Sequence, residues 1–163
     1  MGSPDRSLPS GYRQVTIPIF RNQSMEPSVE VTFTNSLIKE FERSHIGRIV
    51  EPAQAEVVIE GEIKSIAYKP SGKKDSGLPT GVVLATSYDI EMVVGITVKR
   101  QSDQSVLWAG EFSRSRSYSA AQVTLPGINT VNPLYNLSAR RQNFDILAAD
   151  MMAEAHDRLT ENF

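Results

Sequence analysis

The sequence has no cysteine among its 163 residues, which excludes disulfide bonds and thiolate metal sites. It has only two histidines, and they do not form a metal-binding motif. Neither positive nor negative charge dominates, because the formal net charge is −2 at pH 7. No global field therefore draws the chain to nucleic acid or to an anionic membrane. No apolar run approaches the roughly 20 residues that span a bilayer.

Motifs that carry enzyme chemistry are also missing. The chain contains no Gly-x-Ser-x-Gly elbow, no P-loop and no Gly-x-Gly-x-x-Gly turn. Carboxylates stand in alternate positions at Glu60 and Glu62, and again at Asp89 and Glu91. They alternate with apolar residues, which predicts the wet face of a sheet. His156 is predicted to face solvent late in the last helix. We therefore predict a protein that is not an enzyme and holds no metal or cofactor.

The most informative feature that is present is a long alternation of apolar and polar residues. From Val82 to Val98 every second residue is apolar or threonine, as in a strand with one buried face. Residues 101–105 predict a turn, after which the alternation resumes, so the sequence predicts a long antiparallel hairpin. A straight first strand would measure about 60 Å at roughly 3.3 Å per residue, so we expect it to bend or to begin later. The resumed buried face is predicted to contain Val106, Trp108, Gly110 and Phe112.

Two amphipathic helices flank the hairpin. The first is predicted to begin at Pro27 or Ser28 and to end near Ser44 or His45, with Gly47 as the residue that closes it. The second is predicted over residues 138–161. The apolar face of the first contains Phe33, Leu37, Ile38 and Phe41, and that of the second contains Phe144, Leu147, Ala148, Met151, Ala155 and Leu159.

Two more strands are predicted. One covers residues 15–20, where Pro18 indicates an edge strand or a bulge. The other covers residues 55–68, and the changed parity of Ile66 and Tyr68 predicts a bulge near Ser65. Residues 69–81 and 119–136 are predicted as irregular segments. The element order β-α-β-β-β-α predicts an α+β fold, a two-layer sandwich with two helices on one face of a four-stranded mixed sheet.

The first residues are predicted to lie outside the domain. Met1-Gly2-Ser3 looks like an added start, and residues 1–10 contain no apolar signal segment, so we expect a native leader to have been removed. Residues 11–163 are predicted to form a single domain.

Basic residues fall in three separate places that the hairpin would bring together. Lys69, Lys73 and Lys74 precede the long strand, Arg114 and Arg116 follow its partner, and Arg140 and Arg141 open the last helix. The start of the first strand of a hairpin lies beside the end of the second, so these residues are predicted to converge. Lysine and arginine both pair with phosphate, which predicts an anion site. Ordinary solvated charge is the alternative for each residue taken singly.

The order of these pieces resembles a known family. The pieces are Gly11-Tyr12, Ile17-Pro18-Ile19-Phe20-Arg21-Asn22-Gln23-Ser24, the helix with Leu37-Ile38-Lys39-Glu40-Phe41, residues 55–63, the long strand, Val106-Leu107-Trp108 and an alanine-rich last helix. Together they are similar to the LptE family, the lipopolysaccharide-assembly lipoproteins of the Gram-negative outer membrane. The resemblance covers residues 11–162.

The resemblance implies a non-catalytic, lipid-anchored protein on the periplasmic face of the outer membrane. It implies that the domain plugs and helps to assemble the large β-barrel LptD, and that it binds lipopolysaccharide for delivery to the cell surface. Family members begin with a lipidated cysteine at the place that Ser10 occupies here. The residues implied to contact lipopolysaccharide match Lys73 or Lys74 and Arg140 or Arg141 by position.

A second reading comes from another class. The Ile-Pro-Ile-Phe strand followed by a helix also resembles periplasmic lipoproteins that activate peptidoglycan synthases, and curli-secretion proteins. Such proteins bind another envelope protein and have no affinity for lipid A. An isolated two-layer domain with four strands in one sheet favours the first reading, and a sheet with helices on both faces favours the second.

Overall fold

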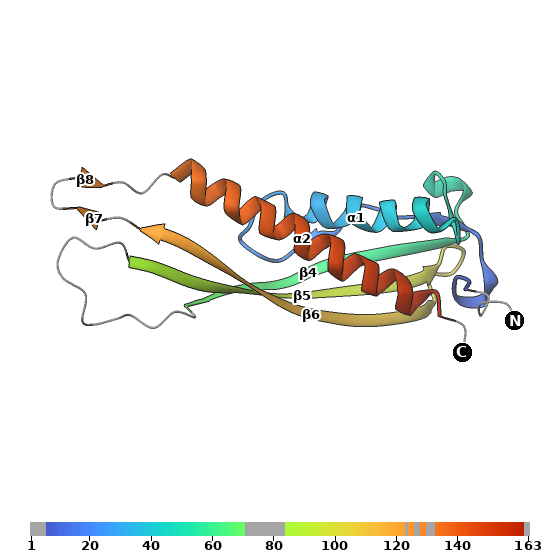
Figure 1. Cartoon of the computed structure of the whole chain (residues 1–163). Helices are drawn as coiled ribbons and strands as arrows, with labels where there is room; N and C mark the ends of the chain where they lie inside the picture. Colours follow the sequence, from blue (N-terminus) through green and yellow to red (C-terminus); the bar gives the residue numbers. More distant parts are fainter. Residues whose placement is uncertain (1–5, 71–83, 123, 126–127, 130–132, 162–163) are drawn as a thin grey trace, which may run out of the picture.

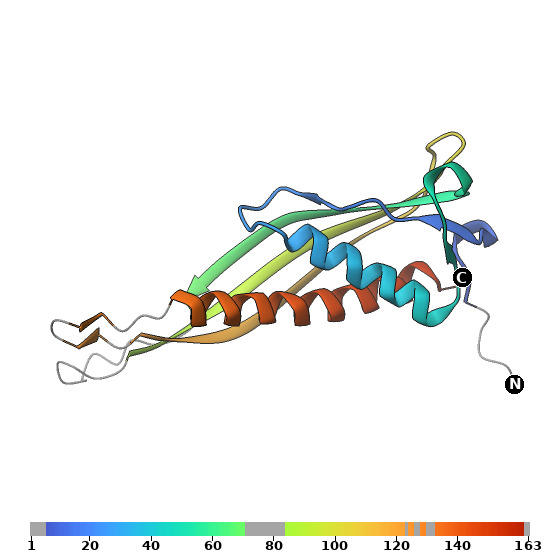
Figure 2. The same ribbon diagram turned by 90° about the horizontal axis from the view of Figure 1, so that it is seen from above.

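The chain folds into two layers, a twisted sheet and a pair of helices that cover one of its faces (Figure 1). A computed structural model describes residues 6–70, 84–122, 124–125, 128–129 and 133–161. Seen from above, the two helices run along the sheet at an angle to each other and cross toward their C-terminal ends (Figure 2). Among the described residues, no helix is both long enough and apolar enough to span a membrane.

The main sheet has six strands in the order β3-β1-β4-β5-β6, and β2 also pairs with β4. The strands β1, β2 and β3 are parallel to their neighbours, whereas β4, β5 and β6 form an antiparallel meander. A separate hairpin consists of β7 (Thr124–Leu125) and β8 (Ile128–Asn129). The main strands are β1 (Gln14–Thr16), β2 (Arg21–Asn22), β3 (Arg48–Ile49), β4 (Val57–Pro70), β5 (Leu84–Arg100) and β6 (Val106–Gln122).

The predicted fold class is confirmed in part. The fold is α+β with both helices on one face of a mixed sheet, but the sheet has six strands and not four. The predicted first strand is divided, since Ile17–Phe20 lies between β1 and β2 without strand structure. Pro18 has no N–H to donate to a ladder, which accounts for the break. The two-residue β3 is too short for an alternation pattern to reveal it.

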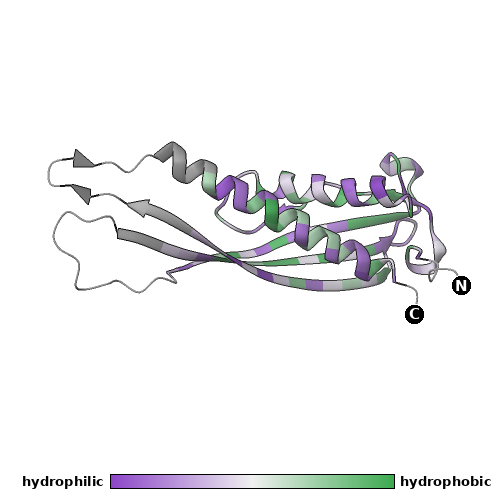
Figure 3. Cartoon of the chain, viewed as in Figure 1, coloured by the Kyte–Doolittle hydropathy of each residue, from purple (hydrophilic) through white to green (hydrophobic). Residues whose placement is uncertain are grey.

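Register within the meander determines which side chains face the helices. The predicted bulge is present, because the pairing of β4 with β5 shifts between Ile63 and Ser65. A second shift lies between Val98 and Lys99 of β5, opposite Val106 and Trp108. It turns Val106 out to 59% exposure, so the prediction that Val106 is buried is wrong. Alternating green and purple bands along the strands in Figure 3 show the alternation of apolar and polar residues.

The core lies between the helices and the sheet. Helix α1 (Val29–Ser44) buries Phe33, Leu37 and Phe41, and α2 (Pro133–Leu159) buries all six residues of its predicted apolar face. The even-numbered residues of β5 from Ile90 to Val98 are buried opposite them. Trp108 packs against this core from its margin and is only half-buried, unlike the prediction. Its ring is stacked on Phe112 with the centroids 6.3 Å apart.

Helix α1 ends at Ser44 as predicted, whereas α2 differs from its predicted bounds at both ends. Helix α2 begins at Pro133, five residues before the prediction, and proline is well suited to the first turn of a helix. Helix α1 is closed by His45 in the left-handed conformation, with φ at 58° and its N–H bonded to the Phe41 carbonyl at 3.0 Å. The prediction that Gly47 closes α1 is therefore wrong. A Cβ at Gly47 would lie 3.0 Å from Leu8 and 3.1 Å from Val15, so the glycine permits close packing instead. Two short 3₁₀ helices lie at Pro9–Gly11 and Pro52–Gln54.

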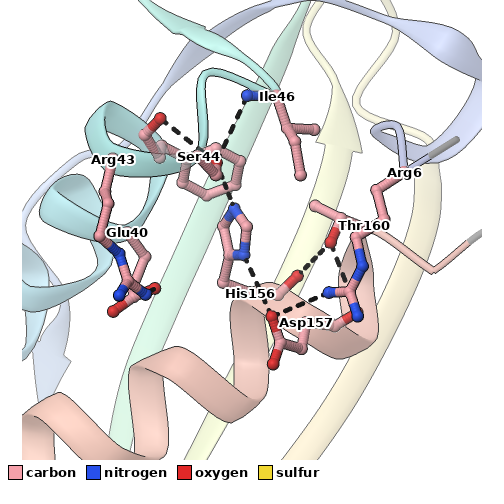
Figure 4. A network of polar contacts seen from close by, with 9 residues as sticks. Arg6, Glu40, Arg43, Ser44, Ile46, His156, Asp157 and Thr160 are labelled. Carbon is pink, nitrogen blue, oxygen red and sulfur yellow. Dashed lines mark hydrogen bonds and ion pairs between the residues drawn. The ribbon is translucent and has the colours of Figure 1, made fainter. Parts of the chain in front are cut away.

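His156 joins the C-terminal ends of the two helices (Figure 4). It is 3% exposed, so the prediction that it faces solvent is wrong. Its Nε2 lies 2.8 Å from the Ser44 hydroxyl, and its ring meets Phe41 edge-on with centroids 4.8 Å apart. Nδ1 has no hydrogen-bond partner within the described structure and lies 3.6 Å from Asp157, which forms an ion pair with Arg6. Burial lowers the pKa of His156 in spite of the nearby carboxylates of Asp157 and Glu40.

Ser44, His156 and Asp157 thus lie together where the two helices end, but their arrangement is structural and not that of a catalytic triad. The Ser44 hydroxyl accepts the Ile46 N–H at 3.3 Å and also contacts the Phe41 carbonyl at 3.4 Å. The imidazole is buried between two helices, out of the reach of a substrate. A nucleophile needs access to its substrate and a base oriented by a close third group, and Asp157 is too far from Nδ1 for a normal hydrogen bond.

We expect the stability of the fold to fall as the pH drops below about 6.5, the usual pKa of histidine. The unfolded chain takes up a proton at His156 first, because burial lowers the pKa in the folded state. Where the unfolded state binds more protons, stability decreases with falling pH, by at most about 1.4 kcal/mol per pH unit for one group. The loss ends once the pH passes below the folded pKa.

Urea denaturation at pH 7.5 and pH 5.0 measures this effect. The difference between the two pH values should shrink in His156→Gln and stay unchanged in His45→Asn. His45 is the matched control because it is exposed and its left-handed backbone tolerates asparagine. An equal change in both variants would contradict the assignment to His156.

Candidate functional site

The register of the meander places Tyr68, Ile90 and Arg116 in one row on the helix-covered face of the sheet. This row lies toward the distal end of the sheet, which we define as the end where β4 reaches Pro70. Helix α2 passes over it, and Arg116 Nε donates to Asn143 Oδ1 at 2.6 Å. Asn143 is held in turn by a 2.8 Å hydrogen bond from its Nδ2 to the Ala139 carbonyl.

Glu26 binds Tyr68 of this row and also Arg140 of α2. Its Oε1 lies 3.0 Å from Arg140 Nη1, and it also accepts the Tyr68 hydroxyl. Asn22 holds the loop of Glu26 in place, since Asn22 Nδ2 donates to the Glu26 carbonyl at 2.6 Å. We call Glu26, Tyr68, Arg116, Arg140 and Asn143 the distal polar layer. Within it, the charge of Arg140 is already balanced by Glu26.

Burial shapes the protonation of the tyrosines at this end. Burial raises the pKa of Tyr68, and the hydrogen bond that Tyr68 donates to Glu26 raises this pKa further. Burial likewise raises the pKa of Tyr118. Tyr118 is stacked on Tyr88 across the β5–β6 pair, with ring centroids 5.7 Å apart. Tyr68 therefore stays neutral and acts as a hydrogen-bond donor to Glu26.

Arg141 differs from Arg140, although the two are adjacent in sequence. Its side chain is exposed, and the structure records no ion pair for it with the described residues. A hollow of about 410 Å³ lies between the start of α1 and α2, and both arginines line it together with Glu26 and Asp145. Arg141 is thus the cation of this pair that can accept an external anion without breaking an existing contact.

The other predicted site residues are distributed over both faces. Lys69 lies on the open face of the sheet, where its Nζ is 3.0 Å from Glu91. Arg114 lies on the covered face but binds α2 further along, at 3.1 Å from Glu154 and 3.6 Å from Asp150. Lys73 and Lys74 fall outside the described residues. The structure therefore brings Arg116 and Arg140 into one layer, with Arg141 at its margin, and separates Lys69 and Arg114 from them.

Several members of the site were not foreseen from the sequence. Glu26, Tyr68, Tyr118 and Asn143 were absent from the candidate residues, although they form most of the distal polar layer and its surroundings. The signal for the tyrosines was available, because Tyr68 and Tyr118 both continue the buried parity of their strands. No sequence pattern links Glu26 to residues more than 40 positions away.

Fold and site together define a class, a two-layer α+β binding domain with a charged and aromatic layer at one end. The family model for LptE, described as lipopolysaccharide-assembly, matches residues 12–162. The chain belongs to the LptE family, the lipopolysaccharide-assembly lipoproteins of the Gram-negative envelope. This confirms the resemblance found in the sequence, and the prediction of a protein without catalytic activity agrees with it. A comparison with curated proteins gave no match.

Solved structures share the fold at low sequence identity. A PelC dodecamer from Paraburkholderia phytofirmans has 14% identity and a TM-score of 0.56, covering 92% of this chain and 90% of the other. A putative neuraminyllactose-binding hemagglutinin homolog from Helicobacter pylori has 9% identity and a TM-score of 0.58, covering 99% and 91%. A putative lipoprotein from Caulobacter crescentus has 10% identity and a TM-score of 0.54, covering 86% and 87%. At these identities the likeness concerns the fold alone.

Proposed function

We propose that this protein binds the phosphate groups of lipopolysaccharide at its distal end and occupies the lumen of an LptD-type β-barrel in the outer membrane. Membership of the LptE family supports lipopolysaccharide as the ligand. The observation that carries the binding site is the pair Arg140 and Arg141, one held by Glu26 and the other exposed beside the same hollow.

Binding at this site takes place in two parts. Arg141 meets a phosphate first, because its guanidinium has no competing carboxylate to leave. Arg140 is oriented by Glu26, so it contributes when a phosphate replaces that carboxylate. Arginine suits this exchange because its planar fork binds carboxylate and phosphate in the same two-point geometry. Lys73 and Lys74, which precede β5 in the sequence, are proposed to add charge from the adjoining segment.

The face of the sheet that the helices leave uncovered, the open face, supports the proposal that a β-barrel is the partner. Helices cover only the other face (Figure 1), whereas helices on both faces would have favoured the second reading. The open face carries ion pairs, with Lys64 2.7 Å from Glu111 and Lys99 2.9 Å from Glu60, and it also exposes Val106. Such a surface fits the polar interior of a large membrane barrel. We propose a lipid-anchored position on the periplasmic face of the outer membrane.

We expect Arg141→Glu to weaken binding of purified lipopolysaccharide by about tenfold, which corresponds to about 1.4 kcal/mol. Loss of one charge-assisted pair accounts for a change of this size. The thermal midpoint should not move, because the residue is exposed. Arg21→Glu provides the control, with the same change of charge on an exposed residue of β2. Equal losses in the two variants would reject the site.

Co-purification with the LptD barrel of the same organism tests the partner. We expect a one-to-one complex that survives size-exclusion chromatography, since obligate partners bury large surfaces. Failure of two folded proteins to associate would instead favour a periplasmic regulator of another envelope protein.

A further inference from the structure

A cleft of about 1050 Å³ opens at the basal end of the molecule, opposite the distal polar layer. We define this end by the two chain termini (Figure 1) and call the opening the basal cleft. It lies between the residues that precede β1, the C-terminal end of α1 and β3. Its lining includes Tyr12, Arg13, Phe41, His45, Arg48 and Ile49. The function proposed above uses none of them.

The cleft concentrates positive charge. Arg13 and Arg48 stand on adjoining segments, joined by a 2.7 Å hydrogen bond from the Arg48 N–H to the Arg13 carbonyl. Both side chains are exposed, and no ion pair to either is recorded within the described part of the chain. Arg6 also lines the cleft but is engaged with Asp157 at 2.9 Å. Glu42 is the one carboxylate among the lining residues. This surplus is local, because the whole chain carries a net charge of −2.

Apolar surface adjoins the charge. Ile46 and Ile49 are half-buried in the lining of the cleft and form what we call its apolar floor, whereas Phe41 behind them is fully buried. A free inorganic anion would gain nothing from these residues, whereas an amphiphile would contact them with its glycerol and first acyl carbons. Guanidinium groups at the rim would bind its phosphate. The combination therefore fits a lipid headgroup better than a soluble phosphate.

The position of the basal cleft is consistent with a membrane surface. Both ends of the chain meet here, where the Ser7 N–H donates to the Thr160 carbonyl at 3.2 Å. Gly11 and Tyr12, just before β1, form part of the cleft wall. A tether at the start of the chain would thus hold this end of the domain against a bilayer.

We propose that the basal cleft binds the headgroup of an anionic phospholipid and docks the domain on the membrane surface. Arg13 and Arg48 pair with the lipid phosphate, and the apolar floor receives the carbons next to it. This site is separate from the distal polar layer, so its failure and the failure of the proposed function can be distinguished.

Co-sedimentation of the chain with vesicles tests the proposal. We expect binding to vesicles of phosphatidylcholine mixed with phosphatidylglycerol and none to pure phosphatidylcholine. The double variant Arg13→Gln/Arg48→Gln should bind roughly 30-fold more weakly, from the usual contribution of two basic residues at an anionic surface. The control Arg21→Gln/Lys39→Gln removes the same charge from exposed positions outside both the cleft and the distal site, and it should retain binding.

Three results would overturn the proposal. The first is a wild-type chain that does not bind the anionic vesicles. The second is an equal loss in both double variants, which would indicate an unspecific effect of charge. The third is complete displacement by inorganic phosphate, which would indicate a soluble anion. Binding of lipopolysaccharide by Arg13→Gln/Arg48→Gln should be unchanged, and a loss there would assign the cleft to lipopolysaccharide instead.

Discussion

Replacing Phe112 with alanine should lower the free energy of unfolding by about 3–5 kcal/mol. The ring is 2% exposed in β6 beneath α2, and it pairs across the sheet with Val94. The Arg158 guanidinium also lies over the Phe112 ring, 5.1 Å from the ring centroid. Removing it leaves a cavity that the rigid meander cannot close, and it takes away the support of that cation. Urea denaturation monitored by circular dichroism measures the loss.

Trp108→Ala is the matched comparison, since the two rings are stacked in the same strand. Trp108 is half-buried, so we expect a loss of only about 1–2 kcal/mol, part of the usual 1.5–3 kcal/mol of a fully buried side chain. Sequence parity alone places Trp108 on the buried face, which predicts a loss of about 3–5 kcal/mol for this variant as well. Equal losses for both variants would restore that prediction and contradict the burial described here.

Gly61→Ala should destabilise the fold by about 3 kcal/mol through overpacking. A Cβ at Gly61 would lie 2.4 Å from the Phe20 ring, which is 3% exposed and cannot swing into solvent. The loop of Phe20 is fixed as well, because the Phe20 N–H donates to the Thr34 hydroxyl of α1 at 3.0 Å. Thermal and urea denaturation should both report the loss.

Gly95→Ala provides the control in the neighbouring strand. A Cβ there would meet Lys64 Cε at 2.9 Å, and this flexible side chain can move aside. We expect a change close to zero, because relief of the entropic cost of glycine offsets the small rearrangement. The second variant Gly61→Ala/Phe20→Leu should recover part of the lost stability by making room. No recovery would place the cause elsewhere than in the Phe20 contact.

Periodicity was sufficient to predict the elements with long-range regularity. The α2 stripe from Phe144 to Leu159 is buried as expected, and so are the even-numbered residues of β5 from Ile90 to Val98. The parity change at Ile66 located a real bulge. In each case the pattern repeats over several turns or residue pairs, so a single exception does not hide it.

The predictions that are wrong concern positions where a single residue or a single contact determines the structure. Val106 follows the parity of β6, but a single shift opposite Lys99 turns it outward. His156 is polar, yet the distant Ser44 hydroxyl compensates one ring nitrogen in the core. Gly47 resembles a helix stop, while His45 closes the helix two residues earlier. None of these contacts has a signature in the local sequence.

The candidate site was predictable only as a set of cations. Basic residues could be counted, and hairpin geometry predicted that those of the hairpin and of the last helix converge; in the structure Arg116 contacts Asn143 of α2. The sequence could not reveal that Glu26 would neutralise Arg140, or that Glu154 would bind Arg114. Whether an arginine is available to a ligand depends on its tertiary partners, and here Arg141 is distinguished from Arg140 by those partners alone.

The length of the sheet sets the distance between the two ends of the domain. A strand of 17 residues such as β5 extends about 55 Å at roughly 3.3 Å per residue. That length exceeds the hydrocarbon thickness of a bilayer, about 30 Å. A domain fastened at its basal end and standing upright would therefore present its tyrosines more than one membrane thickness from the point of attachment. Shortening β4, β5 and β6 together would change this reach without altering any residue at either end.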